Sequence, residues 1–471
     1  MKLRQRPQPC GPARLRRSRS RPCGSVLVIV LWIAFGLVSL ALYFANAMSF
    51  ELRASDNRVS AQAADQAIEG AVRYLNYLLT TQIANGSNGV LPNLEDPLCH
   101  AVPVGDAHYW LIGRDTNNPV GPSRLCFGLV DEASKLNLNA VASNTVIWLP
   151  RMTVDLTQAI LDWRDTNGNG PTVTYYAMQQ PSYQCKCDSF ETVDEVRLLY
   201  GADMDTLLGE DANRNGVLDA SENDDNQDNM LDPGVLEYFT VYSREPNTNS
   251  DGSARINVAN LSGSSAQLSS LLLTNFGTTR TDQILASLGL AGSGPGRSRG
   301  GVPSAVGFAS PLQFYVRSGM TAAEFALIST NLTATEGSYV EGRVNVNTAS
   351  AAVLACLLGE DTDVAEQLVN YRQSNPDNLT SVAWVVDALG QTYPDALQTL
   401  AARDVLTTQS YQFTADVAAL GPYGRGYRRV KFVFDTSSGS PTIVYRQDLT
   451  HLGWALGQEV RQNWLLAKAA Q

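Results

Sequence analysis

Histidine is scarce in this chain of 471 residues, which has only three, scattered as His100, His108 and His451. No nucleophile elbow and no phosphate-binding loop can be recognised, and no pair of carboxylates stands in an apolar setting. Enzymes need such groups to activate a nucleophile or to move a proton. The sequence therefore predicts a protein that is not an enzyme.

Cysteine also lacks a metal-binding pattern. Seven cysteines are present, but none combines Cys-x-x-Cys spacing with a matching pair of histidines, so a zinc site is not expected. If the protein is exported, a disulfide between Cys99 and Cys126 is the first expectation. Cys185 and Cys187 are too close in sequence to pair easily with each other, so other pairings, or a set of buried free thiols, stay open.

Acidic residues are absent from the first 24 residues, which hold eight Lys and Arg, although the whole chain has a formal net charge of -11. Without that leader the remainder carries -11 minus 8, or -19. An acidic body is a poor partner for nucleic acid or for an anionic membrane surface. We therefore expect no nucleic-acid partner, and we do expect a bound cation.

Charged side chains are missing between residues 21 and 51, where an apolar run extends from Ser25 to about Ala45. About 21 residues at 1.5 Å each span roughly 30 Å, the thickness of the hydrocarbon core of a bilayer. The basic leader predicts that the rest of the chain lies across the membrane from it. The run fits a plain membrane anchor, a pilin-type stalk or a removable signal, for which Ala45-Asn46-Ala47 would be the cleavage site.

Glycine and proline are absent from Leu37 through Gln66, which favours the stalk. Apolar residues then recur at spacings of three and four, the pattern of a helix that buries one face. They are Ala64, Ile68, Ala71, Val72, Leu75, Leu78 and Leu79. We expect one helix from Ser25 to about Thr81, roughly 85 Å long. Its first half suits lipid and its second half packs on a globular head.

The basic leader that ends at Gly24, followed by a small residue and an unbroken apolar helix, resembles a type IV prepilin signal. This resemblance implies that prepilin peptidase cuts between Gly24 and Ser25. Most pilins carry Glu at the fifth mature position, where this chain has Ile29. That Glu pairs with the subunit just ahead in the filament, and an unpaired carboxylate is costly in a bilayer. A subunit at the tip can do without it, and the pattern is similar to that of the general secretion pathway protein K family, the large minor pseudopilins of type II secretion.

Further segments follow in the order of that family. They are "DEASKLNLN" (Asp131–Asn139), "ILDWRDTNGNGP" (Ile160–Pro171), "FETVDEVRLLYG" (Phe190–Gly201), "FTVYS" and "GRVNVNTASAAVLACLLG". Near the C-terminus, "RRVKFVFDTSSGSPTIVYRQDLTHLG" alternates apolar and polar residues around a Ser-Ser-Gly-Ser turn. It predicts a hairpin with Val430, Phe432 and Phe434 on one strand and Ile443 and Tyr445 on the other.

The expected fold class is α+β. A pilin-like long N-terminal helix packs on a small antiparallel sheet built from both ends of the chain, and a large, mostly helical insertion resembles helix-hairpin-helix or SAM-like domains. The expected parts are the leader 1–24, the transmembrane half of the helix 25–45, the rest of the helix with the first strands 46–152, the insertion 153–408 and the closing strands 409–471. Within the insertion, "ARINVANLSGSSAQLSSLL" (Ala254–Leu272) echoes "GRVNVNTASAAVLACLL" (Gly342–Leu358), with a Gly/Ser-rich loop at 289–304 between them.

The acidic stretch Glu210–Gly234 matches a calcium-binding loop. Positions 1, 3, 5, 7, 9 and 12 are taken by Asp211, Asn213, Asn215, Val217 (through its carbonyl), Asp219 and Glu222, with Gly216 at position 6. The spacing matters because a hard cation binds 6–8 oxygens, and alternate residues of a tight loop around a Gly supply them.

A second loop follows directly, with Asp224, Asn226, Asp228 and Asp232 at positions 1, 3, 5 and 9 and Asn229 in place of the Gly. Carboxylates packed this closely repel one another unless a cation neutralises them. Structural calcium is therefore expected, as it is in pseudopilins of this kind, and a solvated acidic loop is the alternative. The fragment Asp165, Asn167 and Asn169 shows part of the same pattern.

"LLGEDTDVAEQLVNYR" (Leu357–Arg372) aligns with a helix-hairpin-helix, a module that binds DNA phosphates. Its hairpin keeps Gly359 but has Glu360 and Asp361 where an apolar residue and a second Gly belong, and Asp363 where a Lys would stand. Carboxylates repel phosphate. We interpret the fold as retained and the DNA binding as lost.

The resemblance implies a minor pseudopilin at the tip of a type II secretion pseudopilus, which helps to initiate assembly and export across the outer membrane. It would be a single-pass inner-membrane protein with a periplasmic head. Its partners would be other minor pseudopilins, bound through the helix face from Ala64 to Leu79, and the secretion machinery. The alternative is a type IV pilus or competence minor pilin whose helix-hairpin-helix head contacts DNA or a surface.

Overall fold

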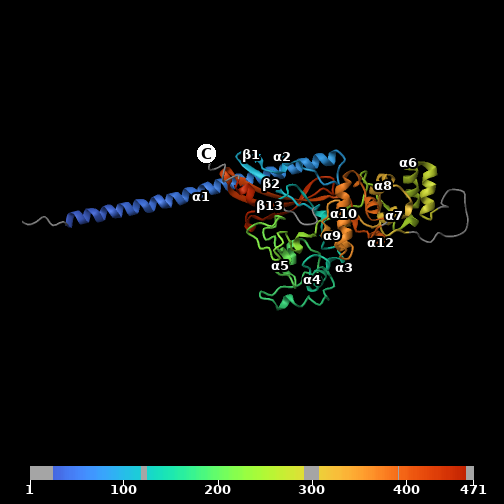
Figure 1. Ribbon diagram of the computed structural model, residues 1–471, viewed down its shortest axis with the longest axis horizontal. Coiled ribbons are helices and arrows are strands. Elements are labelled where there is room, and N and C mark those ends of the chain that lie inside the picture. Colours follow the sequence, from blue (N-terminus) through green and yellow to red (C-terminus); the bar gives the residue numbers. More distant parts are fainter. Residues whose placement is uncertain (1–24, 118–124, 291–306, 391, 463–471) are drawn as a thin grey trace, which may run out of the picture. The chain divides into compact units, whose positions relative to one another are not determined.

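The computed structural model describes residues 25–117, 125–290, 307–390 and 392–462 (Figure 1). The chain divides into two compact units between Val59 and Ser60. The predicted leader with Gly24, and most of the predicted loop at 289–304, lie outside the described residues.

A single helix, α1 (Ser25–Ala84), confirms the predicted unbroken helix. In the first unit, every side chain from Val26 to Met48 is exposed, and nearly all of them are apolar. Among the described residues, α1 is the one helix long and apolar enough to cross a membrane. An exposed apolar surface of this length is unfavourable in water, because apolar groups are stabilised by leaving it.

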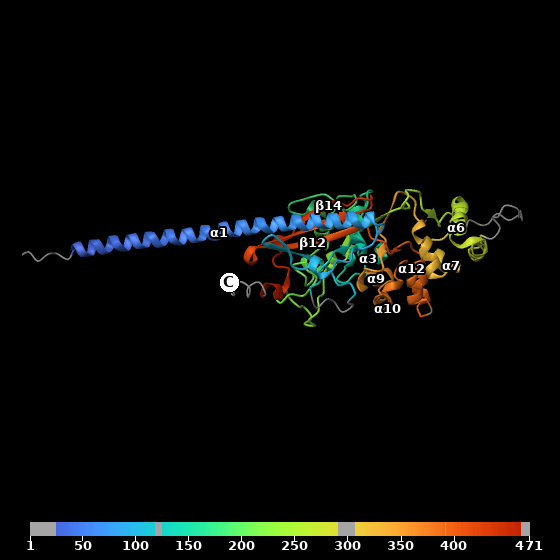
Figure 2. The same ribbon diagram turned by 90° about the horizontal axis from the view of Figure 1, so that it is seen from above.

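In the second unit, the later part of α1 packs along the sheet (Figure 2). Ala64, Ala67, Ala71 and Leu75 are fully buried there. The predicted apolar stripe is thus confirmed as a buried face, but its assignment to sibling subunits is wrong. The face from Ala64 to Leu79 is covered by the protein's own sheet, because Phe413, Phe432 and other strand residues pack against it.

The sheet has the strand order β1-β2-β12-β13-β14, with β3 paired to β12, and all these pairs are antiparallel. The strands are β1 (Val102–Val104), β2 (Ala107–Ile112), β3 (Val130–Asp131), β12 (Gln412–Gly421), β13 (Arg425–Asp435) and β14 (Thr442–Asp448). The sheet therefore combines both ends of the chain, and β13 with β14 forms the predicted hairpin. The expected α+β fold, with its long helix, antiparallel sheet and helical insertion, is confirmed.

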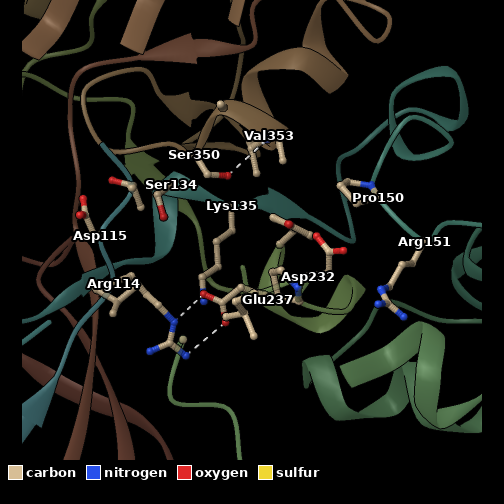
Figure 3. A pocket seen from close by; sticks show the side chains of 18 of the residues that line it. Arg114, Asp115, Ser134, Lys135, Pro150, Arg151, Asp232, Glu237, Ser350 and Val353 are labelled. Carbon is tan, nitrogen blue, oxygen red and sulfur yellow. Dashed lines mark hydrogen bonds and ion pairs between the residues drawn. The ribbon is translucent and has the colours of Figure 1, made fainter. Parts of the chain in front are cut away.

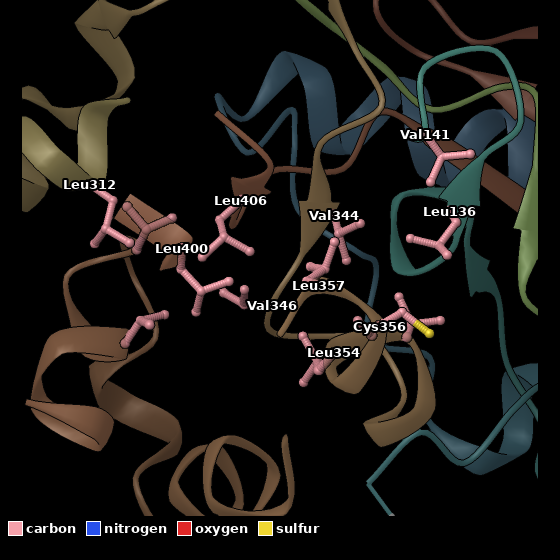
Figure 4. Close-up of a cluster of buried hydrophobic side chains, with 14 of the residues drawn as sticks. Leu136, Val141, Leu312, Val344, Val346, Leu354, Cys356, Leu357, Leu400 and Leu406 are labelled. Atoms are coloured by element: carbon pink, nitrogen blue, oxygen red, sulfur yellow. The ribbon is translucent and has the colours of Figure 1, made fainter. Parts of the chain in front are cut away.

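Helices dominate the segment between β3 and β12, and most of them are short. They are α3 (Ser143–Val146), α4 (Val154–Arg164), α5 (Met204–Leu208), α6 (Leu261–Ser287), α7 (Pro311–Ser318), α8 (Ala322–Ile328), α9 (Ala351–Leu357), α10 (Thr362–Ser374), α11 (Trp384–Leu389) and α12 (Pro394–Ala401). Their apolar faces share one continuous core, part of which extends from Leu136 through Leu354 to Leu312 (Figure 4). Burial of this face outweighs the weak intrinsic stability of such short helices.

Three two-residue parallel pairs lie within this segment, and each pair joins the two ends of one excursion of the chain. They are β4 (Leu136–Asn137) with β5 (Phe239–Thr240), β7 (Ile256–Asn257) with β8 (Leu332–Thr333), and β10 (Val344–Asn345) with β11 (Leu406–Thr407). In every pair the Asn Oδ1 accepts from the backbone N–H two residues later at 2.9–3.0 Å. In every pair the Thr hydroxyl accepts in the same way at 3.0–3.2 Å. The predicted repeat is therefore real, and it has a third copy that begins at Leu136.

None of the five described cysteines takes part in a disulfide. The expected disulfide between Cys99 and Cys126 is absent, because the Cys99 thiol turns back on its own short helix α2 (Asp96–Cys99). It lies 3.5 Å from the Glu95 carbonyl oxygen.

Helix α1 approaches the turn between β12 and β13 so closely that only glycine fits there. A Cβ at Gly421 would lie 2.1 Å from the Ser60 carbonyl oxygen, and one at Gly426 would lie 2.3 Å from the Ala61 nitrogen. We expect Gly421→Ala to lower the free energy of unfolding by about 1–3 kcal/mol, the range for overpacking. Thermal and urea unfolding of the full chain in detergent would measure this loss.

Gly263→Ala is the matched control, because a Cβ at Gly263 meets nothing within 4 Å. Alanine there should leave stability unchanged or raise it by about 0.5–1 kcal/mol, since glycine is a poor helix former. Equal effects of the two substitutions would show that the close approach of α1 to the turn is unimportant.

Candidate functional site

The first acidic loop folds as a calcium-loop turn. The Asp211 carboxylate accepts from the backbone N–H groups of Asn215 at 2.9 Å and of Gly216 at 2.8 Å. Gly216 has φ +80, and its missing side chain leaves room for Arg114, whose Cδ would be 2.8 Å from a Cβ. The Glu222 carboxylate closes the loop, accepting from the N–H groups of Asn213 at 3.0 Å and of Asp219 at 2.9 Å. The predicted residues are thus brought together around one turn.

The second loop repeats this turn. Asp224 Oδ2 accepts from the Asn229 N–H at 2.9 Å, and Asn229 has the left-handed φ of +60 that its place in the pattern requires. The Asn226 amide donates to Asp228 at 3.0 Å and to Asp232 at 2.9 Å. The four predicted residues of this loop therefore lie together as well.

Glu210 closes the second loop, a role that the sequence analysis missed. Its two carboxylate oxygens accept from the N–H groups of Asp225 at 2.7 Å and of Asp232 at 2.9 Å. Asp232 is position 9 of its loop, as Asp219 is of the first, so Glu210 matches Glu222 in its action. Position 12 of the second loop is Val235 in the sequence. The lack of a carboxylate at that position was the available signal that the acid must come from elsewhere.

Each loop contains one buried oxygen atom that could bind a cation. Asn213 Oδ1 in the first loop and Asp224 Oδ1 in the second are buried and have no hydrogen-bond partner among the described residues. Such atoms are costly unless something binds them. Burial raises the pKa of Asp211 and of Glu222, and also of Asp232, where Glu210 and Asp228 add repulsion. A cation would relieve each of these costs, so the donor set fits calcium.

The carboxylates do not form a finished cage. Within the described ranges, no three His, Cys, Asp or Glu side chains are clustered as a metal-ligand group. The reason is that Asp211, Glu222 and Glu210 point at backbone amides. The fragment at Asp165 likewise forms an exposed turn in which Oδ1 accepts from the Asn167 N–H at 3.0 Å.

Two arginines, one buried and one partly buried, bind the first loop from the sheet side. Arg429 of β13 is fully buried; its guanidinium donates to Asp416 of β12 at 2.6 and 2.9 Å and to the carbonyls of Asn213 at 2.5 Å and Arg214 at 2.7 Å. Arg114, just after β2, donates to the Arg214 carbonyl at 3.0 Å and the Asn215 carbonyl at 3.3 Å. The sheet therefore recognises the backbone of the loop and not its acids.

The C-terminal segment binds the same loop. The side-chain amides of Asn213 and Asn215 donate to the carbonyls of Trp454 at 3.3 Å and Ala455 at 3.2 Å. The first loop is thus hydrogen-bonded to Arg114 after β2, to Arg429 of β13 and to residues 454 and 455.

A cavity of about 420 Å³ lies beside the first loop, and its lining includes the charged residues Arg114, Glu237 and Arg151 (Figure 3). Arg114 Nε is 2.7 Å from Glu237, and Arg151 is 2.7 Å from Asp205. Burial opposes the ionisation of Glu237. The Arg114 guanidinium outweighs this effect and lowers the pKa of Glu237 to about 2. The Arg114–Glu237 pair therefore keeps both groups charged at the wall of this cavity.

The Asp-Glu pair in the family-like stretch joins the insertion to the sheet. Asp131 Oδ2 accepts from the Asn345 amide at 2.9 Å and the Thr348 hydroxyl at 2.5 Å, and also from Ser410. Glu132 accepts from Thr240 and Thr414, each at 2.5 Å. Burial raises the pKa of Asp131, although its hydrogen bonds oppose this rise. The role of this pair is therefore structural.

Helices α9 and α10 are joined by a tight turn in which Gly359 and Glu360 both have positive φ. The Asp361 carboxylate caps α10 by accepting from the Val364 N–H at 3.1 Å. The turn is exposed and carries acids, so a phosphate would meet negative charge there.

Residues 344–403, which run from β10 to α12, match the model of the family described as "Type II secretion system (T2SS), protein K". The resemblance to the protein K family is confirmed. No curated protein matches the chain. Among solved structures, the chain is similar to one described as the crystal structure of the GspK-GspI-GspJ complex from the enterotoxigenic Escherichia coli type 2 secretion system. The two share 9% identity, with a TM-score of 0.42 and coverage of 84% of this chain and 99% of that one.

The matched protein K segment begins at the strand that binds Asp131, whereas the acidic loops and their arginines lie outside it. We expect Arg429→Gln to lower the free energy of unfolding by about 3–5 kcal/mol, because it leaves Asp416 buried without its partner. It should also increase hydrogen exchange in residues 211–222 and 453–456. Urea unfolding and exchange mass spectrometry would measure both effects.

Arg428→Gln is the matched control one residue earlier. Arg428 lies 3.4 Å from Asp65 in a largely exposed pair. Its loss should cost no more than about 1 kcal/mol. Similar losses in the two variants would contradict the role given to Arg429.

Proposed function

We propose that the chain is a membrane-anchored minor pseudopilin of type II secretion, with α1 as its stalk and the second unit as its head. The observation that carries the proposal is the match of residues 344–403 to the protein K family. It is supported by α1, whose exposed apolar residues 26–48 suit a single pass through the inner membrane. The acidic head would then lie in the periplasm, as the basic leader predicts.

Residue 29 supports a place at the tip of the pseudopilus. Ile29 is apolar and exposed on α1, where most pilins have a Glu that pairs with the subunit ahead. The subunit at the tip of a filament has no subunit ahead of it, so it has no pairing partner for that Glu and can do without it. The proposed role is therefore to initiate assembly and to help export across the outer membrane.

Sibling minor pseudopilins are the proposed partners, as the name of the similar complex says for its own chains. The sheet covers the face from Ala64 to Leu79, so the contact must use other residues of α1. The exposed apolar side chains of residues 26–48, together with Phe50, Leu52, Val59 and Tyr77, are uncovered within the described chain. Packing between helices would remove this surface from water or lipid.

The proposal gives calcium a structural role in both acidic loops. Asp211, Asn213, Asn215, Asp219 and Glu222, with the Val217 carbonyl, would hold one ion. Asp224, Asn226, Asp228 and Asp232, with Glu210, would hold the other. Calcium supplies the positive charge that this cluster of carboxylates lacks and fixes the turn to which Arg114 and Arg429 bind.

Calcium should raise the melting temperature of the full chain, and Asp211→Asn or Glu210→Gln should reduce that rise. Each substitution removes one negative oxygen from a loop, so each should weaken calcium binding at its own loop at least tenfold. Calorimetric titration with calcium and melting in calcium or chelator would measure this. Asp363→Asn, an exposed acid outside the loops, is the control. Equal drops in melting temperature with calcium and with chelator would remove the metal from the proposal.

Processing tests the anchor. Co-expression with prepilin peptidase should give a chain that starts at Ser25, and Gly24→Leu should remain uncut because the bulky residue replaces the glycine of the cleavage site. N-terminal sequencing of the membrane fraction reads both results. A start at Met48 would mean that the apolar segment is a removable signal, and the pseudopilin function would be lost with it.

The alternative is a pilus or competence minor pilin that touches DNA through the α9–α10 turn. The shape of the turn favours this alternative. Its charge opposes the alternative, because Glu360, Asp361 and Asp363 are acidic. Neighbouring genes discriminate between the two: pseudopilin genes and a secretion ATPase support the proposal, and DNA-uptake genes support the alternative.

A further inference from the structure

Two cysteines, Cys185 and Cys187, lie side by side in the loop that precedes the short 3-10 helix Val193–Leu198. The Cys187 backbone amide hydrogen-bonds to the Cys185 sulfur, and the two thiol groups interact directly. Both side chains are half-buried, so part of each remains open to a small reagent. The pair takes no part in the acidic loops or in the contacts of α1.

The backbone explains why a spacing of two brings these sulfurs together. Cys187 has φ +49, in the left-handed region that residues with a side chain rarely adopt. A positive φ re-aims the Cβ relative to the preceding peptide. The expectation that two cysteines so close in sequence cannot easily pair assumed ordinary backbone angles, and this residue does not have them.

Contacts on both sides hold the pair in place. Cys185 Sγ is 3.7 Å from the Asp162 carbonyl, and the Asp188 N–H donates to the Trp163 carbonyl at 3.1 Å, so the loop is attached to the end of α4. Lys186, between the cysteines, is bound elsewhere: its Nζ is 3.1 Å from Glu195 and 3.3 Å from Glu191. A fixed loop lowers the entropy that the two thiols must lose to react with each other.

The other described cysteines are placed differently. Cys99 and Cys356 are buried, and the Cys99 thiol lies 3.5 Å from the Glu95 carbonyl. Cys126 is half-buried and lies in a distant part of the chain, beside β2. Among the described cysteines, Cys185 and Cys187 are therefore the pair whose thiol groups interact with each other.

We propose that Cys185 and Cys187 form a disulfide with each other when they meet an oxidant that itself carries a disulfide, such as a periplasmic thiol oxidase. The cellular part of this rests on the proposed export, since that oxidant acts in the periplasm. One cysteine loses its proton and attacks the oxidant's disulfide, and the second cysteine then attacks the mixed disulfide. The Cys185–Cys187 bond forms, the oxidant's sulfur–sulfur bond breaks, and the oxidant leaves as two thiols that carry both protons.

Burial, with the adjacent Cys187 thiol, raises the pKa of Cys185 to about 11. The site therefore does not provide the stabilised thiolate to which strong dithiol oxidants owe their power. A bond between Cys185 and Cys187 would close a small ring within the loop, while the contacts with Asp162 and Trp163 attach that loop to the end of α4.

The test uses the full chain in detergent, treated with oxidised glutathione, then denatured, alkylated with N-ethylmaleimide and digested. Mass spectrometry should find the peptide that holds both cysteines lighter by two hydrogens and without alkyl groups. Full alkylation of both cysteines after treatment would overturn the proposal. So would a bond from either one to Cys99 or Cys126, or stable glutathione adducts on the unmodified pair.

Variants and the cellular chain complete the test. Cys185→Ser should leave Cys187 alkylated or bound to glutathione, whereas the control Cys126→Ser should leave the Cys185–Cys187 bond unchanged. The chain is also recovered from producing cells under acid quench. If glutathione closes the bond but the cellular chain is reduced and uncut at Ser25, the result contradicts the proposed export and supports the disulfide. If the cut and exported chain keeps both thiols reduced, the result contradicts the disulfide and supports the proposed function.

Discussion

The buried Arg429 is the interaction on which the head depends. Its guanidinium faces Asp416 within the sheet and, on its other edge, the carbonyls of the first acidic loop. A guanidinium is well suited to this place because its planar fork can satisfy a carboxylate and two carbonyls at once. The charge of the arginine is balanced by Asp416, and its contacts with the loop are to the carbonyl oxygens of Asn213 and Arg214. One residue therefore fixes where the loop lies without contacting the acids of the loop.

Much of the fold could be predicted because its signals are local. The single helix follows from a long segment without glycine or proline, and the β13–β14 hairpin follows from alternation around a turn. Gly216 and Asn229 are left-handed as their positions in the loops require. Signals of this kind depend on the conformation of a few neighbouring residues, which the sequence states directly.

Other features depend on contacts between distant residues and could not be predicted. Arg114 and Arg429 are ordinary strand-end and strand residues in the sequence; only the sheet brings them to the same loop. Glu210 acts on a loop that begins fourteen residues later, so no pattern within that loop reveals it. The expected contact of Ala64–Leu79 with siblings was wrong for the same reason, because an apolar stripe does not state which surface covers it.

The three parallel pairs have a consequence for how such a chain can change. Each pair uses two residues at either end of a long excursion, and its Asn and Thr turns are completed within a few residues of the strands. The entropy of closing an excursion grows only with the logarithm of its length. Residues can therefore be gained or lost between the paired ends at little cost, while the six short strands keep their register. The acidic loops occupy one such excursion, so a cation site could be acquired or discarded there without redesigning the framework around it.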